Sequence, residues 1–543
     1  MSSSPNTAPS GVERQDPPRD LESQSPDNDN LKKEILEEQQ HGDDTSPTTE
    51  RRSAGSRFLS LLTVRPGEVY KADADHNPKW YQKLLDAGIE ENGIKPVPLE
   101  QRTVTQYSNL FTVFFTGLLC LLPIPTGMLA TLAFGLSLRD ASLIILFFGL
   151  LTSLPPAFMG IGGMETGLRQ QVQARYSFGR YLSIIPLLLN AATVTGFSLL
   201  AAVVGGQTLA SVNPGHVKVD VGIVIVCLMS FAVSLMGFKA LHWWERWTWI
   251  PNLIAILVAV GCGGKYIYLQ SEAEPATAPQ VLAFGGLIAG YFITFGGTVS
   301  DYSTYHDPRK ASRVKVFLYV YGGLLVPSVP LLVLGAALGG AVPNVPEWAA
   351  GYEATGIGGV MREMLRPAGG FGLFILVLLS LSVIGNIAIS MYSIALNLQM
   401  VLPPFAKIHR FFFILVTMAI MIPMAIRAAQ AWEESLTNFL AVIGYWAGCF
   451  DAVLIMELVV FRRMDYSTYD HAIWNVGSKL PLGVAAIGAS LVSMALVIPG
   501  MEEPWYTGPI AETTGDIGFE MAFVVTALAY LPFRWLEIRL TGR

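Results

Sequence analysis

The sequence predicts an all-α membrane protein with twelve transmembrane helices, and three observations support this fold class. The chain of 543 residues is 52% hydrophobic and only 14% charged. Soluble domains carry about a quarter charged residues, so this charge content is low. The mean hydropathy is +0.44, and the apolar residues gather into segments near the 20 or so residues that one bilayer crossing needs.

These segments follow a long polar start. Residues 1–55 are rich in Ser, Pro, Asp and Glu and predict a disordered cytosolic tail, and residues 56–105 predict a cytosolic or interfacial pre-helix segment. Helices 1–7 are expected within residues 106–340, helices 8–12 within 341–536, and a cytosolic C-terminus at 537–543. The predicted spans are 108–134, 141–163, 181–206, 219–237, 247–267, 281–300, 315–339, 370–398, 410–427, 437–461, 480–499 and 517–536.

The basic residues predict the orientation in the bilayer. Lys and Arg concentrate in the connections after even-numbered spans, as with Arg169, Arg175 and Arg180 after the second. The opposite connections are poorer in basic residues and often acidic, as at Glu502 and Glu503. Since Lys and Arg favour the cytosolic side, both termini are expected in the cytosol.

The first span contains an unusual proline pair in "LLPIPTG". Pro123 and Pro125 each lack an N–H and clash with the preceding turn, and Gly127 adds backbone freedom. In hydrocarbon an unpaired backbone group is costly, so irregular backbone is expected only inside protein or beside a wet cavity. We therefore predict a break near Leu122–Gly127, with a simple proline kink as the alternative.

The sixth span contains a second interruption, in "YFITFGGTVSDY". Gly296 and Gly297, followed by polar residues, are poor material for a lipid-facing helix. Breaks in spans one and six hold equivalent places if the first ten helices form a five-plus-five inverted repeat. This pattern is typical of transporters whose substrate lies between the two discontinuous helices, where half-helix ends offer free backbone groups and partial charge.

Polar residues inside spans are candidates for the site. Asn190 and Asn386 each offer amide donors and an acceptor that can read the edge of a flat heterocycle, or they tie neighbouring helices together. Phe295 offers a surface for ring stacking, or simply packs. The predicted substrate-binding residues are Pro125, Thr126, Asn190, Phe295, Gly296, Gly297, Thr298 and Asn386.

Ionisable residues in or beside spans suggest cation coupling. Asp301 and Glu165 are the candidates, although Asp301 also suits a structural latch to a nearby Arg or Lys. Asp451 and Glu457 lie in the tenth span, six residues apart, and so do not share a helix face. No enzyme motif, metal-ligand spacing, cofactor signature or basic patch for nucleic acid is present, which disfavours an enzyme.

Several segments resemble a known family. The stretches "FGLSLRDA", "GMETGLRQQVQARYSFG", "SDYSTYHDP", "ISMYSIALNLQ", "VVFRRMDYSTYD" and "SKLPLGVAA", in order within about residues 90–535, resemble the fungal purine–cytosine permeases of the nucleobase–cation symporter family. The resemblance implies proton-coupled import of a purine or cytosine across the plasma membrane by a five-plus-five fold.

The resemblance also implies roles for single residues. Asn190 matches the substrate-binding Asn of the third helix, and Phe295 stands where the family usually has a stacking Trp. Asn386 matches the first Asn of an Asn-Asn-x-Pro stretch, in which Ile387 and Ile389 replace the second Asn and the Pro. These apolar changes leave open an importer of another heterocycle, such as a pyridoxine-like vitamin or an allantoin-like compound. A nutrient sensor that keeps the fold, binds without transport and signals through the long N-terminal tail is a separate alternative.

Overall fold

The computed structural model describes residues 93–543, apart from 236–237, 403, 406–407, 409 and 504. The predicted disordered tail, 1–55, and residues 56–92 of the pre-helix segment lie outside the described residues. Each of the twelve predicted spans overlaps a helix. In chain order these helices are α4 (Ser108–Leu118) with α5 (Pro123–Leu132), α6 (Leu138–Thr152) with α7 (Leu154–Thr166), α10 (Ile184–Ala210), α11 (Val219–Leu235), α12 (Phe238–Gly263), α13 (Ala278–Ile293), α14 (Arg313–Ala341), α17 (Gly369–Leu381) with α18 (Val383–Val401), α19 (Arg410–Gln430), α20 (Trp432–Met456), α21 (Val484–Gly500) and α23 (Gly518–Thr541).

Short elements connect these helices. They are η1 (Leu99–Gln101), α8 (Gln170–Gln173), α9 (Arg175–Phe178), η2 (Gly264–Tyr266), η3 (Thr294–Gly297), η4 (Val299–Tyr302), η5 (Val342–Asn344), α15 (Pro346–Thr355), α16 (Ile357–Leu365), η6 (Arg366–Ala368), the π-helical η8 (Glu457–Phe461), η9 (Tyr466–Thr468), the paired strands β1 (Glu502–Glu503) and β2 (Tyr506–Thr507), and α22 (Ala511–Thr514).

The number of membrane crossings follows in part from helix length. Among the described residues, nine helices are long and apolar enough to cross a bilayer, or ten if the bent pair α4–α5 counts as one span. The apolar helices α11 and α21 have 17 residues each, fewer than the 20 or so of a typical crossing. The count of twelve spans therefore stays a prediction.

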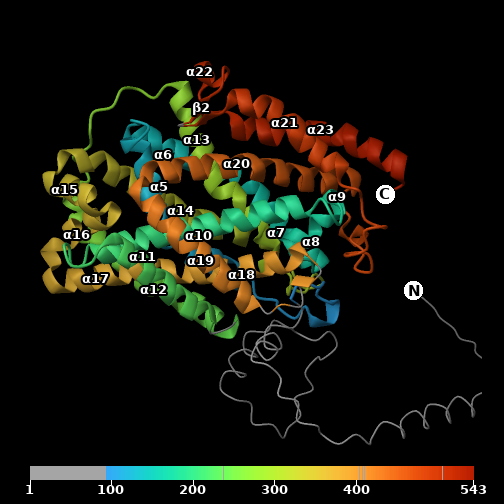
Figure 1. Cartoon of the computed structure of the whole chain (residues 1–543), viewed down its shortest axis with the longest axis horizontal. Coiled ribbons are helices and arrows are strands. Elements are labelled where there is room, and N and C mark those ends of the chain that lie inside the picture. Colours follow the sequence, from blue (N-terminus) through green and yellow to red (C-terminus); the bar gives the residue numbers. More distant parts are fainter. Residues whose placement is uncertain (1–92, 236–237, 403, 406–407, 409, 504) are drawn as a thin grey trace, which may run out of the picture. The chain divides into compact units, whose positions relative to one another are not determined.

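The connections after the second and tenth spans meet at one end of the bundle. Figure 1 shows α8, α9 and the C-terminus at its right-hand end, whereas α15 and α16 lie at the left. The Tyr176 hydroxyl of α9 donates to the backbone carbonyl of Asp470, 2.7 Å away, which joins the connections after the second and tenth spans. This grouping agrees with an even number of crossings between these connections.

The described part of the pre-helix segment is anchored to the end of α7. The buried Arg102 guanidinium donates to the backbone carbonyls of Val97 at 2.9 Å, Glu165 at 3.1 Å and Thr166 at 2.8 Å. The last carbonyls of a helix have no partner within it, so Arg102 supplies one. Burial of this guanidinium lowers the pKa of Arg102.

The first span is broken, as predicted. The break covers residues 119–122, so its centre lies four residues before the centre of the predicted break, Leu122–Gly127. Helix α4 ends at Leu118 and α5 begins at Pro123, with a bend of 54° between them. Pro123 occupies the first position of α5, where its missing N–H is no loss because the first helical N–H groups have no acceptor. The prolines thus start the second half-helix and do not disrupt its middle.

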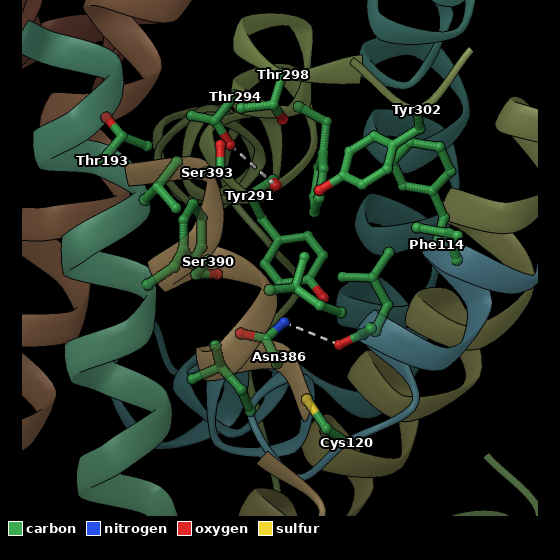
Figure 2. Close-up of a pocket in the computed structure, with 18 of the residues that line it drawn as sticks. Phe114, Cys120, Thr193, Tyr291, Thr294, Thr298, Tyr302, Asn386, Ser390 and Ser393 are labelled. Carbon is green, nitrogen blue, oxygen red and sulfur yellow. Dashed lines mark hydrogen bonds between the residues drawn. The ribbon is translucent and has the colours of Figure 1, made fainter. Parts of the chain in front are cut away.

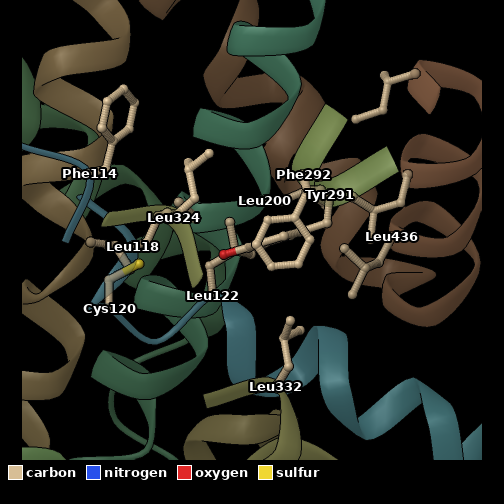
Figure 3. Close-up of a cluster of buried hydrophobic side chains, with 14 of the residues drawn as sticks. Phe114, Leu118, Cys120, Leu122, Leu200, Tyr291, Phe292, Leu324, Leu332 and Leu436 are labelled. Carbon is tan, nitrogen blue, oxygen red and sulfur yellow. The ribbon is translucent and has the colours of Figure 1, made fainter. Parts of the chain in front are cut away.

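The break lies inside the protein core. Leu118, Cys120 and Leu122 are 5%, 2% and 5% exposed, and Figure 3 shows them among other buried apolar side chains. The sixth span is interrupted too, because α13 ends at Ile293 and passes into η3 and η4, as the glycine pair predicted. Both interruptions meet the requirement that irregular backbone be enclosed by protein.

Helices α5 and α14 pack backbone against backbone. A Cβ added at Gly127 would collide with the carbonyl of Leu332, and one added at Gly335 would collide with the carbonyl of Ile124. Small residues allow such close approach between helices in membranes. This glycine seam therefore holds the second half of the broken first span tightly against α14.

A buried ionic network joins the end of α20 to α23. The Arg534 guanidinium lies 2.9 Å from the Glu457 carboxylate and 3.0 Å from that of Glu537. Glu457 also pairs with Arg462 at 3.0 Å and accepts from the Tyr530 hydroxyl at 2.8 Å. Because every charge in this network has a partner, its burial is tolerated.

Two buried carboxyl groups, those of Glu503 and Asp516, lie close together in the segment between α21 and α23. Glu503 of β1 is 3% exposed, and the Tyr445 hydroxyl lies 3.4 Å from it and donates to Asp516 at 2.5 Å. Burial, followed by the charge of Asp516, raises the pKa of Glu503 to about 8. Burial also raises the pKa of Asp516.

Candidate functional site

A cavity of about 100 Å³ lies between the two interrupted helices. An apolar cavity of roughly 150 Å³ admits benzene, so this one is of the order needed for one small ring. Figure 2 shows its walls. They are formed by Val113, Phe114, Gly117, Leu118, Cys120, Leu122 and Pro123 of the first span, Thr193, Val194 and Phe197 of α10, Tyr291, Thr294, Phe295, Thr298 and Tyr302 of the sixth span, and Asn386, Ile389, Ser390 and Ser393 of α18.

Carboxamides satisfy the open end of α4. The Asn386 side-chain amide donates to the carbonyl of Gly117 at 2.9 Å, a bond drawn in Figure 2. The Asn252 amide of α12 donates to the carbonyl of Leu119 at 3.2 Å. Two carbonyls exposed by the break thus receive hydrogen bonds from other spans, which explains how the broken backbone is tolerated in the core.

Asn386 keeps an acceptor for a ligand. Its Oδ1 atom has no hydrogen-bond partner among the described residues, and the same holds for the hydroxyl of Ser393, one of the other cavity-lining residues of α18. A buried polar atom without a partner is costly. A ligand with an N–H donor at its edge would satisfy the Asn386 oxygen, so Asn386 both ties helices together and faces the cavity.

Aromatic rings form one wall of the cavity. Phe114 meets Phe295 edge-to-face at 6.1 Å between ring centroids, and meets Tyr302 at 5.2 Å. All three line the cavity, together with Tyr291. Flat rings stack favourably on such surfaces, so this wall suits a planar heterocycle.

The predicted substrate-binding residues divide into two groups. Phe295, Thr298 and Asn386 line the cavity. Pro125 and Thr126 are buried in α5 and are not among its lining residues, and the Thr126 hydroxyl bonds the carbonyl of Leu122 at 3.1 Å. Gly296 and Gly297 lie in η3 between two lining residues without lining the cavity themselves.

Asn190 lies beside the break of the sixth span. It is fully buried, and a Cβ added at Gly297 would collide with its Oδ1 atom. Spacings of three, four and seven residues place it on the helix face of Thr193, Val194 and Phe197, about one turn beyond the cavity. Neither Asn190 side-chain atom has a hydrogen-bond partner among the described residues.

Both predicted coupling carboxylates are held in ion pairs. Asp301 lies 3.7 Å from the Arg169 guanidinium and accepts from the backbone N–H of Gln170 at 2.7 Å. Glu165 pairs with Arg313 at 2.6 Å. The arginine partner of Asp301 comes from the connection after the second span, so the latch joins two different parts of the chain.

Asp451 is a further buried carboxylate, and it lies beside the break of the sixth span. It is fully buried in α20, and neither of its oxygens has a hydrogen-bond partner among the described residues. A Cβ added at Gly296 would collide with both oxygens, so the carboxyl packs directly against the backbone of the broken sixth span.

Sequence reasoning missed several residues of this region. Asn252 follows a proline within an apolar span and was open to the same argument as Asn190 and Asn386. Phe114 and Tyr302 face the cavity, but an aromatic residue in a span is usually a packing residue, so the sequence offers no signal that separates them.

The fold and the site together define a class of protein. Two interrupted helices enclose a cavity with a free carboxamide oxygen and an aromatic wall, which is the arrangement of a broken-helix membrane transporter. A family described as permeases for cytosine/purines, uracil, thiamine and allantoin matches residues 96–521. The chain belongs to this family, and it is a transporter and not an enzyme.

Individual relatives agree with this placement. The purine-cytosine permease fcyB of Emericella nidulans is 33% identical over 484 residues, covering 88% of this chain and 94% of the relative. The purine-cytosine permease FCY2 of Saccharomyces cerevisiae is 30% identical, with 92% and 96% covered. The vitamin B6 transporter TPN1 of the same yeast is 28% identical, with 86% and 90% covered. The resemblance to fungal purine–cytosine permeases is thus confirmed.

A solved structure shares the fold. Mhp1, a nucleobase-cation-symport-1 family transporter solved in a closed conformation with bromovinylhydantoin, superposes with a TM-score of 0.62 at 16% identity, covering 83% of this chain and 96% of Mhp1. The predicted fold class is therefore confirmed, apart from the number of crossings.

Proposed function

We propose that this chain imports a purine- or cytosine-type nucleobase together with protons, by alternating access across the plasma membrane with both termini in the cytosol. The observation that carries the proposal is the Asn386 oxygen, free in a cavity with an aromatic wall. Nucleobases combine a flat ring with N–H donors on the edge, which is the chemistry this cavity would bind. The purine-cytosine permeases among the relatives support the same substrate class.

We assign the predicted site residues different roles within this function. Phe295 and Asn386 would contact the base, with Thr298 beside them, while Asn190 and the glycine pair Gly296–Gly297 would shape the break behind it. Asp301 and Glu165 would act as latches, because each is already paired with an arginine.

A second substrate class has its own support. Ile389 lines the cavity where the family pattern has a proline, and one relative is a vitamin B6 transporter. A pyridine ring is also flat and small, so a pyridoxine-like vitamin is the second candidate.

Uptake into cells that lack their own carriers tests the proposal. Labelled cytosine, adenine and pyridoxine are offered separately, at neutral and at acidic external pH. We expect accumulation of cytosine or adenine that increases in acid and falls in the Asn386→Ala variant. Accumulation of pyridoxine alone would support the second candidate. Binding without accumulation would contradict transport and indicate a sensor.

A further inference from the structure

A second polar cluster lies at the broken sixth span, separate from the cavity. It contains Asp451 of α20, Asn190 of α10 and Gln171 of α8, which approach the glycine pair of η3. The Gln171 amide donates to the carbonyl of Gly297 at 2.9 Å, while its Oε1 atom has no partner among the described residues. This cluster thus brings buried, unpartnered polar atoms from three helices to one short stretch of backbone.

Asp451 is the ionisable member of this cluster. Both carboxyl oxygens are buried without a hydrogen-bond donor in the described part of the chain. An ionised carboxylate in such a place is very costly, whereas a protonated carboxyl is tolerated. The site therefore fits a carboxyl that carries a proton.

Most other titratable groups around α20 face partners of their own, and none donates a hydrogen bond to Asp451 in the described part of the chain. Cys449 contacts the Ser493 hydroxyl and Tyr291 of α13 contacts the Ser328 hydroxyl. Midway along α20, Tyr445 faces Glu503 and Asp516. Directly after α20, Glu457 of η8 faces Arg462, Arg534 and Tyr530, with Glu537 beyond Arg534. Asp301 of η4 faces Arg169. Glu520 lies in the first turn of α23, and its two carboxyl oxygens are also buried without a partner among the described residues.

We propose that Asp451 binds the proton that couples to substrate import. The proposal rests on the proposed function, and it moves the coupling role away from the ion-paired Asp301 and Glu165. One proton joins a carboxylate oxygen from water on the outside and leaves to water on the inside, so no covalent chemistry or further reactant is needed.

The glycine at position 296 explains how this proton would reach the substrate. Without a side chain there, the Asp451 carboxyl touches the backbone between the cavity residues Phe295 and Thr298. Loss of the proton leaves a buried charge that water must reach, and this requires α20 and η3 to separate. Such a separation moves Phe295 and Thr298, so the proton and the substrate each change the affinity for the other.

Transport by the full-length protein in proteoliposomes tests the proposal with two assays. Counterflow, with equal pH and unlabelled cytosine inside, measures exchange alone. Accumulation, with the outside one pH unit more acidic, measures coupling, and one proton per substrate supports a gradient of about tenfold. We expect the wild type to do both, whereas Asp451→Asn should exchange substrate but accumulate it only to an inside-to-outside ratio near one.

Two further variants make the result specific. Asp220→Asn removes an exposed carboxylate of α11 and should behave as the wild type. Asp451→Glu keeps a carboxyl and should accumulate substrate. Accumulation by Asp451→Asn equal to wild type, or its loss in both Asp451 variants while exchange persists, would overturn the proposal. So would uphill uptake that follows a sodium gradient and ignores pH.

A measurement without substrate separates this proposal from the proposed function. If no base or vitamin exchanges in the wild type, the proposed function fails. Infrared difference spectra still show whether Asp451 carries a proton, because a protonated carboxyl has its own C=O band. We expect this band near neutral pH in the wild type and a weaker one in Asp451→Asn. Identical spectra would overturn the proposal.

Discussion

Replacing Asn386 by alanine removes two hydrogen bonds with different consequences. The bond from its amide to the carbonyl of Gly117, 2.9 Å long, supports the broken end of α4. The other is the proposed bond from a ligand N–H to the Asn386 Oδ1 atom, which has no partner among the described residues. Asn252→Ala is the matched variant, because Asn252 supports the neighbouring carbonyl of Leu119 and is not a cavity-lining residue.

The expected magnitudes follow from the burial of these groups. A neutral hydrogen bond contributes about 1 kcal/mol net, and leaving its buried partner unsatisfied costs about 1–3 kcal/mol. The Kd for the substrate should therefore rise in Asn386→Ala by about fivefold if water replaces the amide oxygen, and by about 150-fold if the ligand donor stays dry. Each variant should also lose about 1–3 kcal/mol of stability at the break.

Two measurements on purified protein check this prediction. Substrate Kd comes from equilibrium binding, and Tm comes from thermal unfolding in detergent. We expect a lower Tm in both variants and a raised Kd in Asn386→Ala alone. An equal rise of Kd in Asn252→Ala would mean that the break, and not the Asn386 oxygen, controls affinity. An unchanged Kd in Asn386→Ala would refute the ligand contact.

Three further predictions concern stability and the helix seam. The pKa of Glu503 is raised to about 8, so the stability gained from its protonated form is complete below about 4.5 and is lost as pH rises through 8. Tm should fall over this range, and Glu503→Gln should flatten the slope; an unchanged slope would exclude Glu503 as the cause. Gly335→Ala places a methyl against a backbone carbonyl of α5, so uptake should fall sharply. Gly261→Ala in α12, where an added Cβ meets nothing within 4 Å, is the control and should transport as the wild type; equal uptake by both variants would contradict the seam. Arg534→Leu removes one of the two arginine partners of the buried Glu457 and should lower the free energy of unfolding by about 3–5 kcal/mol, measured as a lower Tm. A Tm equal to wild type would show that Arg462 alone is enough to stabilise the Glu457 carboxylate.

Local chemistry explains what could be predicted from the sequence. Each of the twelve spans predicted from hydropathy overlaps a helix, because a bilayer crossing requires a long run of apolar residues. The motif at Pro123 and Pro125 located the first break within four residues, and the Gly296–Gly297 pair located the second. Each of these signals depends on a few neighbouring residues.

The missed features depend on contacts between distant helices. Asn252 and Leu119 are 133 residues apart, and nothing near either residue in the chain signals their hydrogen bond. Asn190 and Asn386 were expected in one cavity, but only Asn386 lines it. Asn190 lies about one helical turn beyond the cavity-lining residues of α10. Hydropathy identifies a membrane span but does not show how far along that span the cavity lies. The partnerless state of Asp451 likewise depends on how α20 packs against η3.

The glycine seam holds the second half of the first span, α5, more closely against α14 than the first half, α4, is held. Where main chain rests on main chain, sliding one helix past the other would drive carbonyl oxygens into α-carbons, with no flexible side chain to yield. We therefore expect helices α5 and α14 to move together as one rigid body. We expect any hinge motion in the first span to occur at the four residues 119–122, so that α4 changes its angle relative to α5.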